Sequence, residues 1–321
     1  MKYDVVALGE LLIDFTDYGK SMQDNPIFEA NPGGAPGNVL AMLAKLDRKT
    51  AFIGKVGADM FGRLLIDALA QSGIDTTGVL IEEKASTTLA FVCNSLDGDR
   101  EFSFFRKPGA DTMLCQDDVD INLIKNCDIF HFGSLSLTHQ PARCATQIAV
   151  EWAKKAHALI SFDPNLRPLL WDTFEDAKHQ ISWGCSVCDI LKIAVEELFF
   201  ITGKESLKDG IRYLRQQYPH IKLILLTKGK QGAEGYWGQC HFAHPSFMEV
   251  KTIDTTGAGD TFLGCCLSTV LEKGIDSPSQ EDLEEMVVFA NAAASLITTK
   301  KGALLSMPEV QDIEGLLLKA L

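Results

Sequence analysis

The stretch DTTGAGDTFLGCCLSTVL, residues 254–271, joins a glycine-containing turn to a long apolar segment. The residues after Asp260 are apolar or small on nearly all sides, which predicts a helix buried inside the protein. Gly257, Ala258 and Gly259 would leave bare backbone N–H groups at the start of that helix, where unpaired donors and the helix dipole favour an anion. Asp260 is then either an acid stabilised by the dipole or a base beside a bound phosphate.

A second copy of DTTG occurs at residues 75–78, and it continues directly into Val79, Leu80 and Ile81. This copy has no following glycine and no acid, so it offers neither an anion site nor a base. We predict a plain turn that leads into a strand.

Around these motifs the chain alternates β-rich apolar runs with helical patterns, which indicates βαβ units. We therefore predict an α/β fold whose largely parallel sheet is covered by helices on both faces. Helical apolar faces run through residues 61–69, closed by Gly73, and through residues 283–294. The predicted strands are Tyr3–Leu8, Ala51–Val56, Ile129–Phe132, Leu159–Phe162, Ile190–Ile193 and Lys222–Thr227.

Two segments depart from this alternation, at about residues 10–30 and 86–107. LLIDFT alternates apolar and polar residues, and residues 87–106 contain two such runs around Asp97-Gly98, a strong hairpin signal. We predict a small antiparallel β lid inserted into one α/β domain that spans residues 1–321.

The composition argues against two classes of partner, nucleic acids and membranes. The 321 residues carry a formal net charge of −13, which argues against a nucleic-acid surface, because such surfaces need clustered Lys and Arg. Polar residues interrupt each apolar run well short of a membrane span, and the start of the chain does not resemble a secretory signal. The nine scattered cysteines suit reduced thiols better than a disulfide framework, so we expect a cytoplasmic protein.

Two short pairs have spacings found in metal sites: Cys185 with Cys188, and His241 with His244. Neither has a matching second pair elsewhere, and a structural zinc site needs four ligands. We expect these side chains to pack rather than to bind metal.

Two further loops could bind a ligand. NPGGAPGN at residues 31–38 opens a helix, and Asn38 in its first turn could donate to a ligand hydroxyl or simply face solvent. SFDPNLRP at residues 161–168 leaves a strand at its carboxyl end, where open α/β sheets bind ligands. Asp163, Asn165 and Arg167 would bring an acceptor, an amide and a cation to that edge, although for this motif alone a locally hydrogen-bonded turn is the favoured interpretation.

Taken in order, GELLIDF, NPGGAPGN, FIGKVGADMFG, DPNLRP and DTTGAGDTF resemble the motifs of the ribokinase-like (PfkB) sugar kinases, and most closely those of bacterial and plant fructokinases. The similarity runs from Val5 to about Pro308. It implies transfer of phosphate from ATP to the 6-hydroxyl of fructose, with Asp260 as the catalytic base and the amides of Gly257, Ala258 and Gly259 as the anion hole.

The same resemblance implies the remaining site residues. Sugar-binding positions would be Asp14, Gly33, Gly34, Asn38, Arg106, Asp163, Asn165 and Arg167. ATP-binding positions would be Lys192, Thr227, Lys228, Gly229 and Asn291.

The resemblance also implies ions. The family's Asn-x-x-Glu motif organises Mg²⁺ through water, and here Ala194 stands at the Asn position while Glu197 keeps the Glu. Mg²⁺ would therefore arrive with ATP, with Glu197 acting on it through water, and K⁺ would bind near Asp254.

Two alternatives stay open. Arg106 and Arg167 would also suit the carboxylate of a 2-keto-3-deoxysugar acid, while other sugars such as ribose fit less well. The fold could also carry a sugar-binding regulator without activity, which an intact Asp260 argues against. The protein could form a homodimer through its lid.

Overall fold

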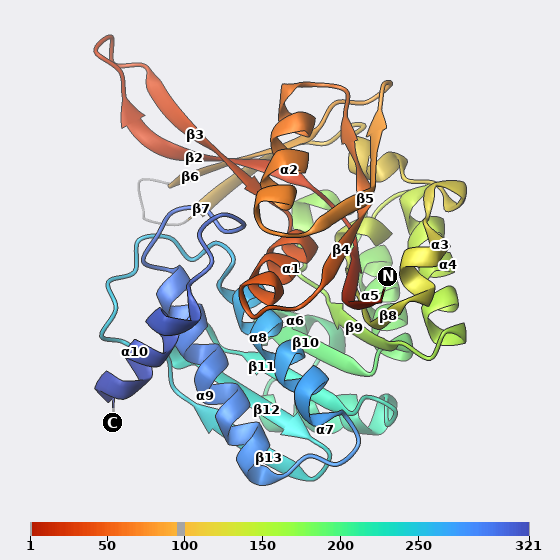
Figure 1. The fold of residues 1–321 in the computed structure, drawn as a ribbon, viewed down its shortest axis with the longest axis vertical. Helices are drawn as coiled ribbons and strands as arrows, with labels where there is room; N and C mark the ends of the chain where they lie inside the picture. The colour runs from red at the N-terminus through yellow and green to blue at the C-terminus, as the bar shows by residue number, and fades with distance from the viewer. Residues whose placement is uncertain (1, 95–99, 321) are drawn as a thin grey trace.

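The computed structural model describes residues 2–94 and 100–320. Within them a nine-stranded sheet runs through the centre of the molecule (Figure 1). Its strand order is β13-β12-β11-β10-β9-β8-β1-β4-β5, and only the pairs that involve β12 and β13 at one edge are antiparallel. The strands are β1 (Tyr3–Leu8), β4 (Thr50–Gly57), β5 (Asp75–Glu82), β8 (Cys127–Gly133), β9 (Leu159–Asp163), β10 (Ile190–Ala194), β11 (Leu223–Thr227), β12 (Ala233–Trp237) and β13 (Cys240–His244).

Helices cover both faces of this sheet, as the alternation in the sequence predicts, and each face has its own apolar core. One core receives residues of α1 (Ala35–Lys45), α2 (Met60–Gln71), α8 (Ala258–Lys273), α9 (Gln280–Ile297) and α10 (Val310–Ala320). The other receives residues of α3 (Ile121–Lys125), α4 (Ala142–Lys155), α5 (Phe174–Val187), α6 (Val195–Thr202) and α7 (Leu207–Gln217).

Helix α8 is the buried helix that its sequence predicts. Its residues from Asp260 to Ser268 are buried, because α1 and α9 pack against it. Gly264 shows how close this packing is: a Cβ added there would lie 2.8 Å from the Met42 side chain on α1. The N-terminus of α8 is therefore held rigidly at the centre of the molecule.

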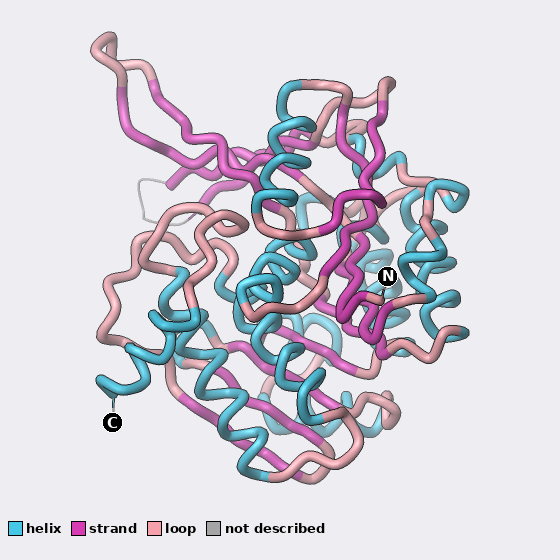
Figure 2. Tube along the Cα trace, in the orientation of Figure 1, coloured by secondary structure: helices cyan, strands magenta, loops and turns pink. Residues whose placement is uncertain are grey.

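The four-stranded second sheet has the order β3-β2-β6-β7 and extends away from the main body (Figure 2). Its strands are β2 (Leu12–Lys20), β3 (Pro26–Gly33), β6 (Thr88–Asn94) and β7 (Arg100–Phe105). β2 pairs with β3, and β6 with β7, in antiparallel fashion, but β2 and β6 are parallel. The predicted turn at Asp97-Gly98 lies outside the described residues.

The prediction for the first DTTG copy is wrong, since Asp75 to Gly78 lie inside strand β5 rather than in a turn before it. The register on β4 shifts here, with Ala51 opposite Asp75 and Ile53 opposite Gly78, so the segment forms a bulge. Asp75 stabilises the bulge, because its carboxylate accepts from the Thr77 amide at 2.8 Å and from the Tyr3 hydroxyl at 2.5 Å.

Among the described residues, no helix is both long and apolar enough to cross a membrane.

Candidate active site

The turn at Gly257 starts helix α8. Gly257 has a φ of 78°, in the left-handed region, and a Cβ added to it would lie 2.6 Å from the Cβ of Ala303. An L-residue with a side chain would be strained there and would clash with its neighbour. Glycine therefore lets the chain turn into α8, whose start, including Gly257 and Gly259, lines a cavity.

Asp260 lies in the first turn of α8 and is buried. Asn38 on α1 donates from Nδ2 to Asp260 Oδ2 over 2.8 Å. Burial and the charge of Asp163 raise the pKa of Asp260 to about 6, although the Asn38 hydrogen bond and the cations Lys192 and Arg167 act in the opposite direction. A carboxyl group with this pKa is mostly ionised near neutral pH and can still accept a proton, which suits a general base.

A buried ion pair between two adjacent strands, β9 and β10, lies beside Asp260. Lys192 of β10 places its Nζ 3.1 Å from Asp163 Oδ1 and 2.9 Å from Oδ2, at the end of β9. The same amino group is close to the start of α8, because a Cβ added to Gly259 would lie 3.1 Å from it. The site thus combines a base, a fixed cation and helix N-terminal amides.

A cavity of about 500 Å³ opens above these groups, between the lid and the main sheet. The lid contributes Leu12, Asp14, Val92 and Phe104 to its lining. The main body contributes the polar residues Glu10, Asn38, Asn165, Arg167, Lys192, Thr255, Thr256 and Asp260, together with Gly34, Gly257 and Gly259. Gly33 lies behind Asp14, since a Cβ added there would be 2.7 Å from Asp14 Oδ2.

A second cavity of about 430 Å³ lies on the other side of the α8 N-terminus. Phe247, Val250 and Phe262 contribute apolar walls, and Asn291 lies at its edge with Nδ2 donating to the His244 carbonyl at 3.2 Å. Thr227, Gly229 and Ala258 also line this cavity. Both cavities reach Thr255 and Gly259, so they meet where α8 begins.

Five predicted site residues lie outside the lining of both cavities: Gly33 and Asp163, whose contacts are described above, and three others. Arg106 is buried and its guanidinium contacts Asp111 at 2.5 and 2.8 Å, Thr138 Oγ1 at 2.9 Å and the Leu135 carbonyl at 2.9 Å. It ties the end of β7 to the main body, and its binding of sugar stays a prediction.

The other two residues are Lys228 and Glu197. Lys228 donates to Glu234 at 2.8 Å. Both carboxylate oxygens of Glu197 accept hydrogen bonds from backbone amides, from Leu166 at 2.7 Å and from Ala194 at 2.8 Å. Neither contact tests their predicted roles toward ATP and Mg²⁺.

Glu10 lines the first cavity, although the sequence analysis did not single it out. It lies two residues after strand β1, at the same carboxyl edge of the sheet as Asp163, the last residue of β9. The strand-end rule that singled out Asp163 could have found it. Leu135 and Phe104 carry no such signal, because an apolar residue that lines a cavity looks in sequence like one that fills a core.

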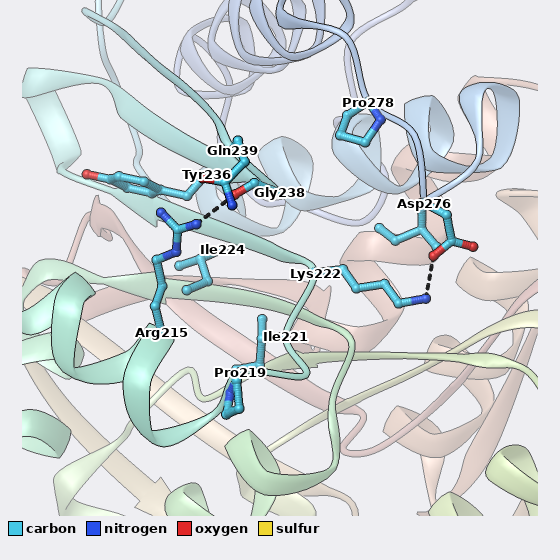
Figure 3. Close-up of a pocket in the computed structure, with 11 residues that line it drawn as sticks. Arg215, Pro219, Ile221, Lys222, Ile224, Tyr236, Gly238, Gln239, Asp276 and Pro278 are labelled. Atoms are coloured by element: carbon cyan, nitrogen blue, oxygen red, sulfur yellow. Dashed lines mark hydrogen bonds and ion pairs between the residues drawn. The ribbon is translucent and has the colours of Figure 1, made fainter.

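A third cavity, of about 340 Å³, lies at the opposite, amino end of β11 (Figure 3). Its two cations are already engaged: Arg215 donates to the Gly238 carbonyl at 2.7 Å, and Lys222 pairs with Asp276 at 2.7 Å. The cavity shares no lining residue with the other two, so we do not assign it to the active site.

Known proteins resemble the chain over nearly its whole length. The sequence model of the pfkB family carbohydrate kinases matches residues 2–310. Fructokinase-1 of Zea mays is 43% identical over 318 residues, which cover 98% of each chain. A fructokinase from Xylella fastidiosa with bound ATP superposes with a TM-score of 0.88 at 30% identity, over 100% of this chain and 99% of that one.

A double mutant of the Vibrio cholerae fructokinase, solved with fructose, ADP and a potassium ion, superposes with a TM-score of 0.86. It is 29% identical, over 98% of this chain and 99% of that one.

Proposed function

Because the chain belongs to the pfkB family of carbohydrate kinases, we propose that it is an ATP-dependent fructokinase that forms fructose 6-phosphate. One observation carries the proposal: a polar cavity and a more apolar one meet at the N-terminus of α8, beside Asp260. The first cavity would hold fructose under the lid, and the second would hold the adenine of ATP against Asn291. The relatives from Zea mays and Xylella fastidiosa support both substrates.

In this reaction Asp260 accepts the proton of the 6-hydroxyl while that oxygen forms a bond to the γ-phosphorus. The bond between that phosphorus and the β,γ-bridging oxygen breaks, and ADP leaves with the bonding electrons. The amides at Gly257 to Gly259 and the Lys192 amino group would stabilise the negative charge on the transferred phosphoryl group. Phosphoryl transfer depends mainly on such positioning and electrostatics, so these groups suffice as protein contributions.

The charges around the sugar cavity favour a neutral sugar over a sugar acid. Glu10, Asp14 and Asp260 line it, while Arg167 and Lys192 are its cations. Lys192 is already paired with Asp163, and Arg106 with Asp111. A substrate carboxylate would therefore find one arginine and several like charges, which supports fructose above a 2-keto-3-deoxysugar acid.

Two ions belong to the proposal. Mg²⁺ would bind with the phosphates of ATP, whose charge it neutralises, since the described residues contain no group of three or more His, Cys, Asp or Glu side chains that could hold a metal. Glu197 is buried next to Lys192 and would act on the Mg²⁺ ion through water. K⁺ would bind at the loop of Asp254, which backbone hydrogen bonds from Ile253 and Asp254 to the Thr298 carbonyl hold in place.

Location and assembly complete the proposal. We propose that the protein lies in the cytoplasm, where the eight cysteines whose side chains the structure describes, all free, would stay reduced. We also propose a homodimer formed through the lid, because Tyr18 and Phe105 leave 62% and 65% of their surfaces exposed on that sheet.

The test is ADP release from Mg-ATP with fructose, 2-keto-3-deoxygluconate, ribose and glucose offered separately. We expect a strong preference for fructose, and we expect Asp260→Asn to lower kcat by about 10²-fold or more while fructose binding stays near normal. Preference for the keto acid would overturn the substrate assignment, and wild-type turnover by Asp260→Asn would overturn the base.

A further inference from the structure

Glu10 is held against the glycine loop at the start of α1. Its Oε1 accepts from the backbone amide of Ala35 over 3.0 Å, and the residue is 2% exposed. Gly34 packs directly on the Glu10 backbone, because a Cβ added to Gly34 would lie 2.3 Å from the Glu10 carbonyl oxygen. The carboxylate thus has a fixed position in the wall of the sugar cavity.

The second oxygen of this carboxylate, Oε2, has no hydrogen-bond partner among the described residues. An unpaired buried acceptor costs a protein stability, and native structures usually keep one for a function or for a ligand. Burial raises the pKa of Glu10 to about 7, although the residue's own backbone N–H and the charge of Arg106 act in the opposite direction. That guanidinium is already taken by Asp111, Thr138 and Leu135, so it gives Oε2 no hydrogen bond.

The cavity that Glu10 lines can supply a donor for Oε2. Glu10 lines it together with Asp14, Asn38 and Asp260, and a sugar in that space presents several hydroxyl groups. We propose that Glu10 Oε2 accepts a hydrogen bond from a non-reacting hydroxyl of the bound sugar, which makes Glu10 a substrate-binding residue that helps to select neutral sugars. The inference rests on the proposed fructokinase activity and adds one contact to it.

A structural role for Glu10 predicts something different. If Glu10 served only to accept from the Ala35 amide, Glu10→Gln would keep that bond through its amide oxygen and would treat every sugar alike. The two roles therefore give different results when the partner hydroxyl is removed from the sugar. If Glu10 and that hydroxyl interact, removing either group abolishes the interaction, so removing both costs little more than removing one.

The experiment measures kcat/KM of the wild type and of Glu10→Gln with fructose and with its 1-deoxy, 3-deoxy and 4-deoxy analogues. With fructose we expect Glu10→Gln to lose about ten- to hundredfold, the value of a hydrogen bond to a charged group. For one of the deoxy sugars, the kcat/KM of the wild type should be lower than with fructose by a similar factor. The kcat/KM of Glu10→Gln should fall much less between the same two sugars. Glu234→Gln is the matched control: its carboxylate contacts Lys228 outside the sugar cavity, so its pattern across the sugars should equal that of the wild type.

The outcomes distinguish the inference from the function on which it rests. If the wild type phosphorylates fructose but Glu10→Gln loses the same factor with every sugar, Glu10 does not contact a hydroxyl and the inference is overturned. If the wild type does not phosphorylate fructose, the proposed function fails, and with it the inference. Calorimetric titration of fructose without ATP repeats the comparison on binding alone, so a variant with impaired chemistry still gives an answer.

Discussion

The hydrogen bond from Asn38 to Asp260 should set the pH at which the enzyme gains its base. Asn38 Nδ2 donates to Asp260 Oδ2 over 2.8 Å between two buried side chains. The bond favours the ionised carboxylate, so it lowers the pKa of Asp260. Burial acts in the opposite direction and is the larger effect, and the resulting pKa is about 6. Asn38→Leu removes the donor with little change in volume and should raise that pKa further.

The size of the shift follows from the energy of the bond. A hydrogen bond to a charged group contributes about 1.5–3 kcal/mol, and one pKa unit corresponds to about 1.36 kcal/mol. The pKa of Asp260 should therefore rise by about one to two units. Since the base must be ionised, the rate increases with pH through this pKa, and the acidic limb of the profile should move upward by the same amount.

The assay is kcat as a function of pH from about 5 to 9, at saturating fructose and Mg-ATP, with ADP quantified directly so that no coupling enzyme adds its own pH dependence. Saturating substrates matter because Asn38 also lines the sugar cavity, and its loss should raise KM as well. Asn291→Leu is the matched control. It makes the same substitution in the second cavity, where Asn291 donates to the His244 carbonyl, so it should change the KM for ATP and leave the limb in place.

An acidic limb that stays at the wild-type pH while the plateau falls would refute the reasoning. Asn38 would then affect substrate position alone, and the group that limits the rate at low pH would not be Asp260. A limb that moves downward would refute it more strongly, because loss of a donor cannot stabilise the ionised carboxylate.

Three further predictions concern the ion pairs and the lid. Lys192→Met should leave Asp163 buried without its cation, lower the free energy of unfolding in urea by about 3–5 kcal/mol and reduce kcat. Arg106→Gln should lower the melting temperature, because Asp111 loses its buried partner, yet leave the ratio of kcat/KM for fructose over 2-keto-3-deoxygluconate within about twofold of the wild type. A large change in that ratio would instead mean that Arg106 contacts the substrate: a fall would indicate a contact with fructose, and a rise a contact with the carboxylate of the keto acid. Phe105→Glu should shift the protein from dimer to monomer in sedimentation velocity, and a wild-type monomer would contradict assembly through the lid.

The fold could be predicted well because an α/β architecture follows from local sequence patterns. The six predicted strands all appear within a residue or two of their positions, since buried parallel strands are continuous apolar runs. Residues such as Asp163 could be placed in advance for a related reason: a polar group directly after a buried strand must lie at the sheet's carboxyl edge.

The sequence could not predict which partners those side chains choose. Arg106 ends a lid strand, as expected, but Asp111, Thr138 and Leu135 occupy its guanidinium, and the last two are about thirty residues away. Glu10 shows the opposite error, since it lies two residues after strand β1, lines the cavity and was not predicted. Such contacts are decided by tertiary packing, which no local pattern encodes.

The two DTTG copies show the same limit within four residues. At Asp254 the carboxylate accepts from the amide and the hydroxyl of Thr256, and the following glycine turns the chain into α8. At Asp75 the carboxylate also accepts from the amide two residues on, yet the segment is drawn into a strand because β4 lies beside it. The local hydrogen bond is shared, so the neighbouring strand decides whether the motif becomes a bulge or the start of a buried helix.

The carboxylates in the sugar cavity connect the fold to the substrate. Glu10, Asp14 and Asp260 lie on three different segments, after β1, on β2 and on α8, and burial raises the pKa of each. Gathering them costs stability, because like charges and desolvation oppose ionisation. A polyhydroxylated sugar offsets that cost by donating hydrogen bonds, whereas a sugar acid would add a further negative charge. We therefore expect the arrangement to be most stable when the cavity holds a neutral sugar, and the same hydrogen bonds would align the hydroxyl that Asp260 deprotonates in the proposed mechanism.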